Sequence, residues 1–180
     1  MGLVFEMGYK KILATAIVIA VLFAGGCTEQ ESTDNGSIEW RDAELTDVTT
    51  GETFRISDFE GKTILVESFA VWCPTCLKQQ KEMQILRERE RTEIIHISLN
   101  TDPNEDVEKV REHVERNDFD WYFAVPPNEF TQALIDEFGI NIVNAPGAPV
   151  VLICKDQSAR LLSGNVKSAE VLEEEIGEGC

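Results

Sequence analysis

The segment TILVESFAVWCPTC, residues 63–76, decides the fold of this chain. Its first half, residues 63–69, is a run of β-branched and apolar side chains, which predicts a strand that is buried on both faces. Pro74 suits the first position of a helix, because the N–H that proline lacks would be unpaired there anyway. The segment therefore predicts a buried strand, a short loop, and a helix that begins at Pro74 and carries Cys73 and Cys76 at its start.

The rest of the chain continues this alternation of strands and helices. A second buried strand is expected at residues 93–99, and Asp102 followed by Pro103 is typical of a helix start. The remaining elements are expected at residues 45–48 and 53–56 (a hairpin), 130–138 (a helix), 150–154 and 160–163 (a second hairpin) and 169–176 (a helix). This order predicts an α/β sandwich.

Length and charge limit the functions that are open to the chain. Its 180 residues suit one domain, and its net charge is −17. A nucleic-acid-binding protein needs a basic face to displace the counterions of phosphates, so we expect no nucleic-acid partner. The same acidity argues against electrostatic docking on anionic lipid.

The first 27 residues have the pattern of an export signal. Two lysines precede an apolar run at residues 12–24, which is too short to span a membrane, and small residues lead to Cys27. This order resembles the lipobox of prokaryotic lipoproteins, although Ala24 stands where that motif usually has leucine. We therefore expect a signal peptide at residues 1–26, a lipidated Cys27 with a polar tether to residue 37, and one domain at residues 38–180. A plain signal peptide or an uncleaved anchor is the alternative, and Met7 is a second candidate for the start.

The two cysteines of the Cys73-Pro-Thr-Cys76 motif are expected to differ in reactivity. Cys73 falls at the N-cap of the predicted helix, where backbone N–H groups and the helix dipole favour a thiolate, so its pKa is expected to be lowered. Cys76 lies one turn further in and suits the resolving role. A zinc site would need a second pair of ligands, and a c-type haem would need histidine where Leu77 stands. We therefore expect no metal and no cofactor.

The motif also carries a family resemblance. Residues 69–76, placed between a strand and a helix, look like the active site of thioredoxin-fold proteins, and residues 45–62 are similar to the membrane-anchored TlpA/ResA-like branch with its redoxin (AhpC/TSA-like) domain. Pro149 before a strand and Gly164 after the last strand match the same pattern. The resemblance covers about residues 43–176 and implies a thioredoxin-like three-layer sandwich, with a central mixed sheet flanked by helices and an N-terminal β-hairpin.

The resemblance also implies which residues meet a substrate. Pro149 is expected to pack in cis beside the cysteine pair, which would leave the backbone of Ala148 free to pair with an extended substrate segment. Ala148 stands where the family often has threonine. Trp72 and Pro74, on either side of Cys73, are expected to contact the substrate as well.

Glu67 is the candidate acid–base residue. It lies six residues before Cys73, where thioredoxins carry a buried acid that exchanges a proton with the resolving cysteine. A buried carboxyl has a raised pKa, which would suit a base for Cys76, whereas an outward-facing Glu67 would be an ordinary strand residue. The lysine that thioredoxins often place on the next strand is replaced by Ser98.

The two histidines and the last two cysteines are not expected to take part in the reaction. His96, on the same face as Ser98, is expected to be structural, with a contact to Glu67 as the alternative. His113 is expected to be exposed on its helix. Cys154 is expected to be a small core residue, and the sequence leaves open whether Cys180 pairs with it or stays free.

The resemblance implies a thiol–disulfide oxidoreductase on the outer face of the cytoplasmic membrane. Cys73 would attack a substrate disulfide, and Cys76 with Glu67 would resolve the mixed disulfide. The implied direction is reduction of exported proteins, apocytochrome c among them, with a membrane electron donor; oxidation is the same cycle reversed. One alternative is a copper chaperone that uses the two cysteines. A thiol peroxidase fits the sequence less well. Peroxidases of this fold carry Thr or Ser three residues before the reactive cysteine and Pro seven residues before it, and here Ala70 and Val66 stand at those positions.

Overall fold

The computed structural model describes residues 39–90, 94–162 and 164–180. The predicted signal peptide, Cys27 and the tether lie outside the described residues. None of the helices in these three ranges is both long and apolar enough to cross a membrane.

A five-stranded mixed sheet forms the centre of the domain. Its strands are β3 (Thr63–Phe69), β4 (Ile94–Asn100), β5 (Tyr122–Ala124), β6 (Val150–Ile153) and β7 (Ala159–Leu161). In the order β5-β4-β3-β6-β7, β4 runs parallel to both β3 and β5, whereas β6 is antiparallel to β3 and β7. Every residue of β3 is buried, as its apolar and β-branched sequence predicts for a central strand.

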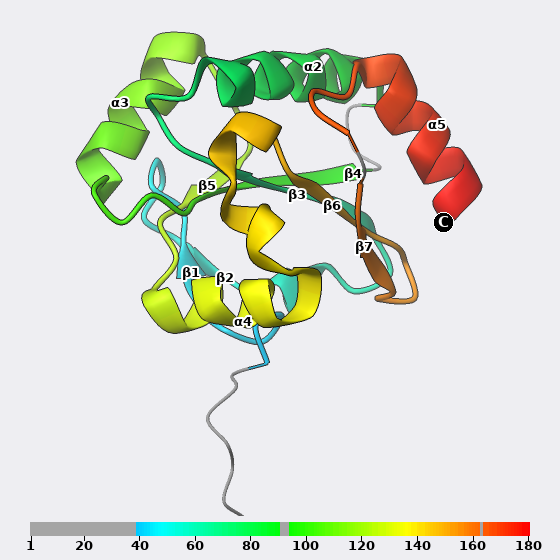
Figure 1. Cartoon of the computed structure of the whole chain (residues 1–180), viewed down its shortest axis with the longest axis horizontal. Helices are drawn as coiled ribbons and strands as arrows, with labels where there is room; N and C mark the ends of the chain where they lie inside the picture. The colour runs from blue at the N-terminus through cyan, green and yellow to red at the C-terminus, as the bar shows by residue number, and fades with distance from the viewer. Residues whose placement is uncertain (1–38, 91–93, 163) are drawn as a thin grey trace, which may run out of the picture. The chain divides into compact units, whose positions relative to one another are not determined.

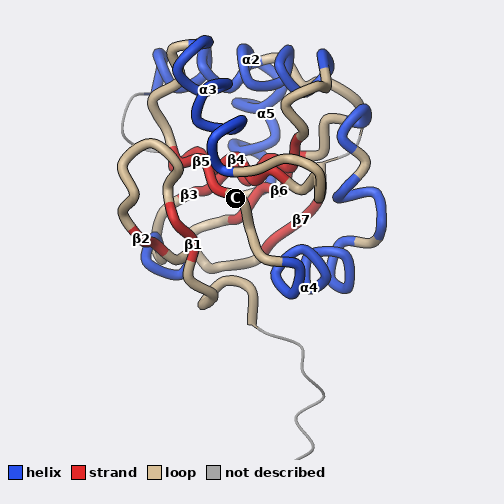
Figure 2. Tube along the Cα trace, turned by 90° about the vertical axis from the view of Figure 1, so that its left-hand side faces the viewer, coloured by secondary structure: helices blue, strands red, loops and turns tan. Residues whose placement is uncertain are grey.

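Helices cover both faces of the sheet (Figures 1 and 2). One side carries α2 (Pro74–Glu90), α3 (Val107–Asn117) and α5 (Ala169–Gly179); the other carries α4 (Asn128–Phe138) with the small hairpin β1 (Leu45–Thr46) and β2 (Thr53–Phe54). Short 3-10 helices lie at Ile56–Phe59, Ile140–Val143 and Ala145–Gly147. The predicted three-layer fold with an N-terminal hairpin is confirmed.

Alternate residues of β3 face opposite layers of the core. Ile64 and Val66 pack in the cluster that includes Phe130 and Leu134 of α4. Leu65 packs with Met83 and Leu86 of α2 and with Leu172 of α5. Because side chains two apart in a strand point the same way, Glu67 faces the α2 layer, as Leu65 does.

Several element boundaries differ from the sequence prediction, and β5 is not among the predicted elements. Asp102 does not begin a helix: α3 starts at Val107, and the Asp106 carboxylate caps it by accepting a hydrogen bond from the Lys109 N–H at 2.9 Å. The last helix continues past Gly177 to Gly179. The sequence alone leaves the pairing of Cys154 and Cys180 open; in the structure a disulfide joins Cys180 to Cys154, the residue after β6.

Candidate active site

Cys73 and Cys76 lie at the start of α2, as predicted. Cys73 immediately precedes Pro74, and the N–H of Cys76 donates a hydrogen bond to Cys73 Sγ at 3.2 Å. Both cysteines are free thiols, and the structure buries Cys73 as well as Cys76. They differ in environment: Cys76 Sγ donates to the Ala145 carbonyl at 3.1 Å. Burial raises the pKa of the Cys76 thiol, and hydrogen bonding with Cys73 and the nearby Glu67 raise it further.

Glu67 is fully buried on β3, so the prediction of a buried acid is confirmed. Its Oε2 accepts a hydrogen bond from Ser98 Oγ at 2.9 Å, and Ser98 Oγ in turn accepts one from Trp121 Nε1 at 3.0 Å. Its Oε1 has no hydrogen-bond partner among the described residues. Burial raises the pKa of Glu67 to about 8, although Ser98, Gln80 and Lys167 act in the opposite direction. A carboxyl with this pKa can exchange a proton near neutral pH.

Neither histidine contacts Glu67 through a hydrogen bond. His96 is buried beside the Trp121 ring, and neither of its ring nitrogens has a partner in the described part of the chain. Burial lowers the pKa of His96 to about 4, which keeps it neutral and structural, as expected. The prediction that His113 is exposed is wrong. Its Nε2 lies 2.7 Å from Gln80 Oε1 and its ring stacks on Phe69, because it sits on the inner face of α3.

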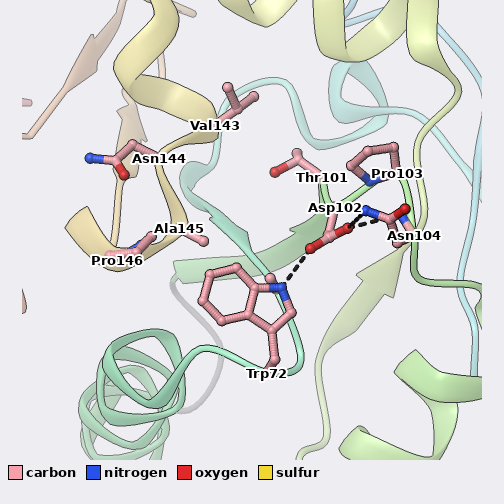
Figure 3. A pocket seen from close by; sticks show the side chains of 10 residues that line it. Trp72, Thr101, Asp102, Pro103, Asn104, Val143, Asn144, Ala145 and Pro146 are labelled. Atoms are coloured by element: carbon pink, nitrogen blue, oxygen red, sulfur yellow. Dashed lines mark hydrogen bonds between the residues drawn. The ribbon is translucent and has the colours of Figure 1, made fainter.

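An open cavity of about 300 Å³ lies beside the cysteines. It is bordered by Trp72, by residues 101–104 and by residues 143–146 (Figure 3). Trp72 is 60% exposed, and its Nε1 donates to Asp102 Oδ2 at 2.5 Å, which fixes the indole at the rim. Pro74 is also exposed. Both residues are therefore placed where a substrate can reach them, and their contact with it stays a prediction.

Ala148 and Pro149 do not have the predicted geometry. The described residues contain no cis peptide bond, so the expected cis Pro149 is wrong. Residues 145–147 form a 3-10 turn, and Ala148 has left-handed backbone angles (φ 46°, ψ 57°), which turn its polar groups inward. Its N–H donates to the Ala145 carbonyl at 2.8 Å and its carbonyl accepts from Lys167 Nζ at 2.9 Å, so its backbone is not free as expected. The residues of this loop that border the cavity are 143–146.

Three side chains that support the site were missed by the sequence reasoning. Glu105 Oε2 accepts hydrogen bonds from the Val71 N–H at 2.7 Å and from Asn100 Nδ2 at 2.6 Å, which fixes the loop before Cys73. Gln80 reaches His113, and Lys167 reaches Ala148. Each contact joins residues more than ten positions apart except Asn100–Glu105, so no local pattern in the sequence indicates them.

Comparisons with known proteins agree with this geometry. The Redoxin family model matches residues 35–157. No curated protein sequence matches the chain. A secreted Mycobacterium tuberculosis disulfide oxidoreductase homologous to E. coli DsbE superposes with a TM-score of 0.62 at 13% identity, over 78% of this chain and 98% of that one.

Two other solved structures have the same fold. A thioredoxin-family thiol:disulfide interchange protein from Chlorobium tepidum TLS gives a TM-score of 0.60 at 16% identity, over 76% of this chain and 91% of that one. A SCO1/SenC family lipoprotein from Bacillus anthracis str. Ames gives a TM-score of 0.60 at 17% identity, over 76% of this chain and 91% of that one. At these identities the likeness shows the fold alone.

Proposed function

The chain belongs to the Redoxin family and has a thioredoxin-like fold, and from this premise we propose that it is a thiol–disulfide oxidoreductase that reduces disulfides of exported proteins with the Cys73/Cys76 dithiol. The observation that carries the proposal is the arrangement of two free thiols at the start of α2, with the Cys76 N–H directed at Cys73 Sγ. This backbone donor, together with the positive end of the helix dipole, stabilises negative charge on Cys73. Cys73 is therefore the attacking sulfur.

The reaction has two thiol–disulfide exchange steps. In the first, the Cys73 thiolate attacks one sulfur of a substrate disulfide, forming a mixed disulfide and releasing the other substrate sulfur as a thiolate, which takes up a proton. In the second, Cys76 gives its proton to the Glu67 carboxylate and attacks Cys73 Sγ. The Cys73–Cys76 disulfide forms, and the second substrate sulfur leaves. Two electrons have then passed from the chain to the substrate.

The cavity beside the cysteines suits a protein segment as substrate. Trp72 offers an exposed indole face at its rim, and the chain opposite it, residues 143–146, includes the Ala145 carbonyl that holds Cys76. An extended segment that carries a disulfide would lie between them, and we propose that Trp72, Pro74 and residues 143–146 border its path. Apocytochrome c is one exported protein of this class.

The place of the reaction is part of the proposal. Lipidation at Cys27 would hold the domain on the outer face of the cytoplasmic membrane, where a dithiol-bearing membrane protein would return two electrons to the oxidised pair. The support is the sequence of residues 10–27. Metabolic labelling with a fatty acid tests the anchor: the wild type should take up label, Cys27→Ser should not, and a label on both would refute attachment at Cys27.

The direction of electron flow is tested by the reduction potential of the Cys73–Cys76 pair. A reductant should have a potential near that of thioredoxin, about −270 mV, and an oxidant one near −120 mV. The purified domain should also reduce insulin, with Cys73→Ser inactive. A potential near the second value would overturn the proposed direction and leave the two cysteines as the reacting pair.

A copper chaperone is the second candidate, and the SCO1/SenC lipoprotein among the similar structures is the observation that favours testing it. Two buried free thiols 3 residues apart could hold Cu(I), which prefers soft thiolate ligands. Within the described residues no group of three or more His, Cys, Asp or Glu side chains could hold a metal ion. Tight copper retention together with a failure to reduce insulin would favour the chaperone over the reductase.

A further inference from the structure

Lys167 is a lysine buried inside the domain without a carboxylate at ion-pair distance in the described part of the chain. It is 3% exposed, and its Nζ donates to the Ala148 carbonyl at 2.9 Å and to the Gly164 carbonyl at 3.4 Å. Lysine is almost never fully buried unless a charge compensates for the lost hydration. We therefore expect a negatively charged group near the Lys167 ammonium.

The backbone of Lys167 is held on the helix that carries the cysteines. Gln79, buried on α2, accepts a hydrogen bond from the Lys167 N–H at 2.8 Å and donates one to the Lys167 carbonyl at 3.1 Å. Gln79 follows Cys76 by three residues, about one helical turn. Lys167 thus has a fixed position relative to the cysteine pair.

The ammonium group binds the loop that leads into β6, and β6 is paired with the segment of β3 that carries Glu67. It is bound to the carbonyl of Ala148, two residues before Val150, and Val150 is the β6 partner of Glu67. The neighbouring residue of β3 is tied to the same loop, since the Ser68 N–H donates to the Pro149 carbonyl at 3.2 Å. Glu67 has one carboxylate oxygen without a partner among the described residues. A cation and an acid that are both buried in this part of the core stabilise each other's charged forms, because the interior screens charge weakly.

Among the described residues, the other groups around Glu67 do not supply a permanent positive charge. Cys76 approaches from α2, Ser98 donates from β4 with His96 two residues away on the same face, and His113 of α3 is linked through Gln80. Burial lowers the pKa of both histidines, which favours their neutral forms. Burial lowers the pKa of Lys167, and the charges of Glu67 and of Glu175 on α5 act in the opposite direction.

We propose that Lys167 is a positioning residue for Glu67: its ammonium group stabilises the carboxylate that accepts the Cys76 proton, a role that rests on the proposed disulfide reduction. The lysine comes from the connection between β7 and α5, on the β6 side of Glu67, whereas Ser98 donates from the β4 side. In the second exchange step, the Cys76 S–H bond breaks and its proton passes to a Glu67 oxygen. The Cys76 thiolate then displaces the substrate sulfur from Cys73.

The test is a titration of the Glu67 carboxyl by ¹³C NMR in the reduced full domain. Lys167→Gln removes the charge and keeps a donor for the Ala148 carbonyl, so a merely structural role would leave the midpoint unchanged. We expect Lys167→Gln to raise the midpoint by about one pH unit, a roughly tenfold smaller ionised fraction at pH 7. Lys167→Arg should restore the wild-type midpoint. An unchanged midpoint in Lys167→Gln would overturn the proposal.

A reciprocal titration covers the case in which Lys167→Gln does not fold. In Glu67→Gln, the Lys167 ammonium should lose its proton at a lower pH than in the wild type, and an unchanged midpoint would equally overturn the pairing. Neither titration needs a substrate. If the wild type fails to reduce insulin but the Glu67 midpoint shifts in Lys167→Gln, only the proposed function is refuted. If the wild type is active but the Glu67 midpoint does not shift, only the pairing is refuted.

Discussion

Cys76 Sγ donates a hydrogen bond to the carbonyl oxygen of Ala145, 3.1 Å away. The resolving thiol is thereby held, still protonated, against the loop that borders the substrate cavity. Its proton must leave before Cys76 can attack, and burial raises the pKa of this thiol above its usual range. A base within the protein is therefore needed for the second exchange step, and Glu67 is buried beside it.

Glu67→Gln should slow the resolution step and stabilise the domain. The variant lacks the base, so single-turnover resolution should fall by roughly a hundredfold at pH 8, the lower end for a lost general base. The wild-type rate should rise as the pH passes about 8, where the Glu67 carboxyl ionises, and the variant should lack this inflection.

The stability effect of Glu67 has a definite sign. The pKa of Glu67 is about 8 in the folded chain against its ordinary value of 4.5, so the unfolded chain binds fewer protons between these pH values. Folding stability therefore falls as the pH rises from about 4.5 to about 8. At pH 7 the free energy of unfolding of Glu67→Gln should exceed that of the wild type by roughly 3 kcal/mol. Urea denaturation at pH 4.5 and pH 7 measures this, and equal differences at both values would contradict it.

His96 should make the domain sensitive to acid. Burial lowers the pKa of His96 from 6.5 to about 4, so the unfolded chain binds more protons between these values and stability is lost as the pH falls from 6.5. The loss should reach roughly 3 kcal/mol at pH 4. In His96→Leu this part of the pH dependence should disappear, as measured by urea denaturation across that range. A variant with the same acid sensitivity as the wild type would exclude His96 as its source.

Asp102 should strengthen the binding of protein substrates, because it holds the Trp72 indole at the rim of the cavity. Asp102→Ala removes the acceptor for the indole N–H and lets the exposed ring leave the rim of the cavity. The lost hydrogen bond is largely exposed and worth about 1 kcal/mol, which corresponds to a KM for insulin that is higher by roughly fivefold. Asp102→Asn retains an acceptor oxygen and serves as the matched control. The rate with a small aromatic disulfide should not change, and a loss with both substrates would instead indicate damage to the cysteines.

The Cys154–Cys180 disulfide should stabilise the domain without taking part in the reaction. It closes a loop with a sequence separation of 26 residues, which corresponds to about 3.5 kcal/mol in the chain-entropy model. The double variant Cys154→Ser, Cys180→Ser should melt at a lower temperature and reduce insulin at the wild-type rate. A loss of activity in a folded double variant would show that this pair also exchanges electrons.

The parts of the fold and site that the sequence predicted depend on local patterns. The apolar run of β3 and the proline after Cys73 determine the strand, the turn and the helix start within 14 residues of each other. The burial of Glu67 follows from the same run, because a central strand in a sheet with two covered faces has no exposed side. These features need no knowledge of distant contacts.

The features that the sequence missed depend on how distant segments meet. His113 is buried because α3 turns the face that also carries Val110 and Val114 inward, and the helix begins four residues later than the Asp102-Pro103 pattern suggests. The inward turn of Ala148 depends on a 3-10 helix that a single sequence does not reveal. Lys167 reaches the site from a connection 100 residues after Glu67.

Trapping of the mixed disulfide tests the central claim most directly, that Cys73 attacks and Cys76 resolves. Reduced Cys76→Ser should accumulate a covalent complex with a disulfide-bonded protein such as insulin, which non-reducing electrophoresis and intact mass would detect. Cys73→Ser should form none under the same conditions. A complex that forms through Cys76 in Cys73→Ser, with none in Cys76→Ser, would contradict the account.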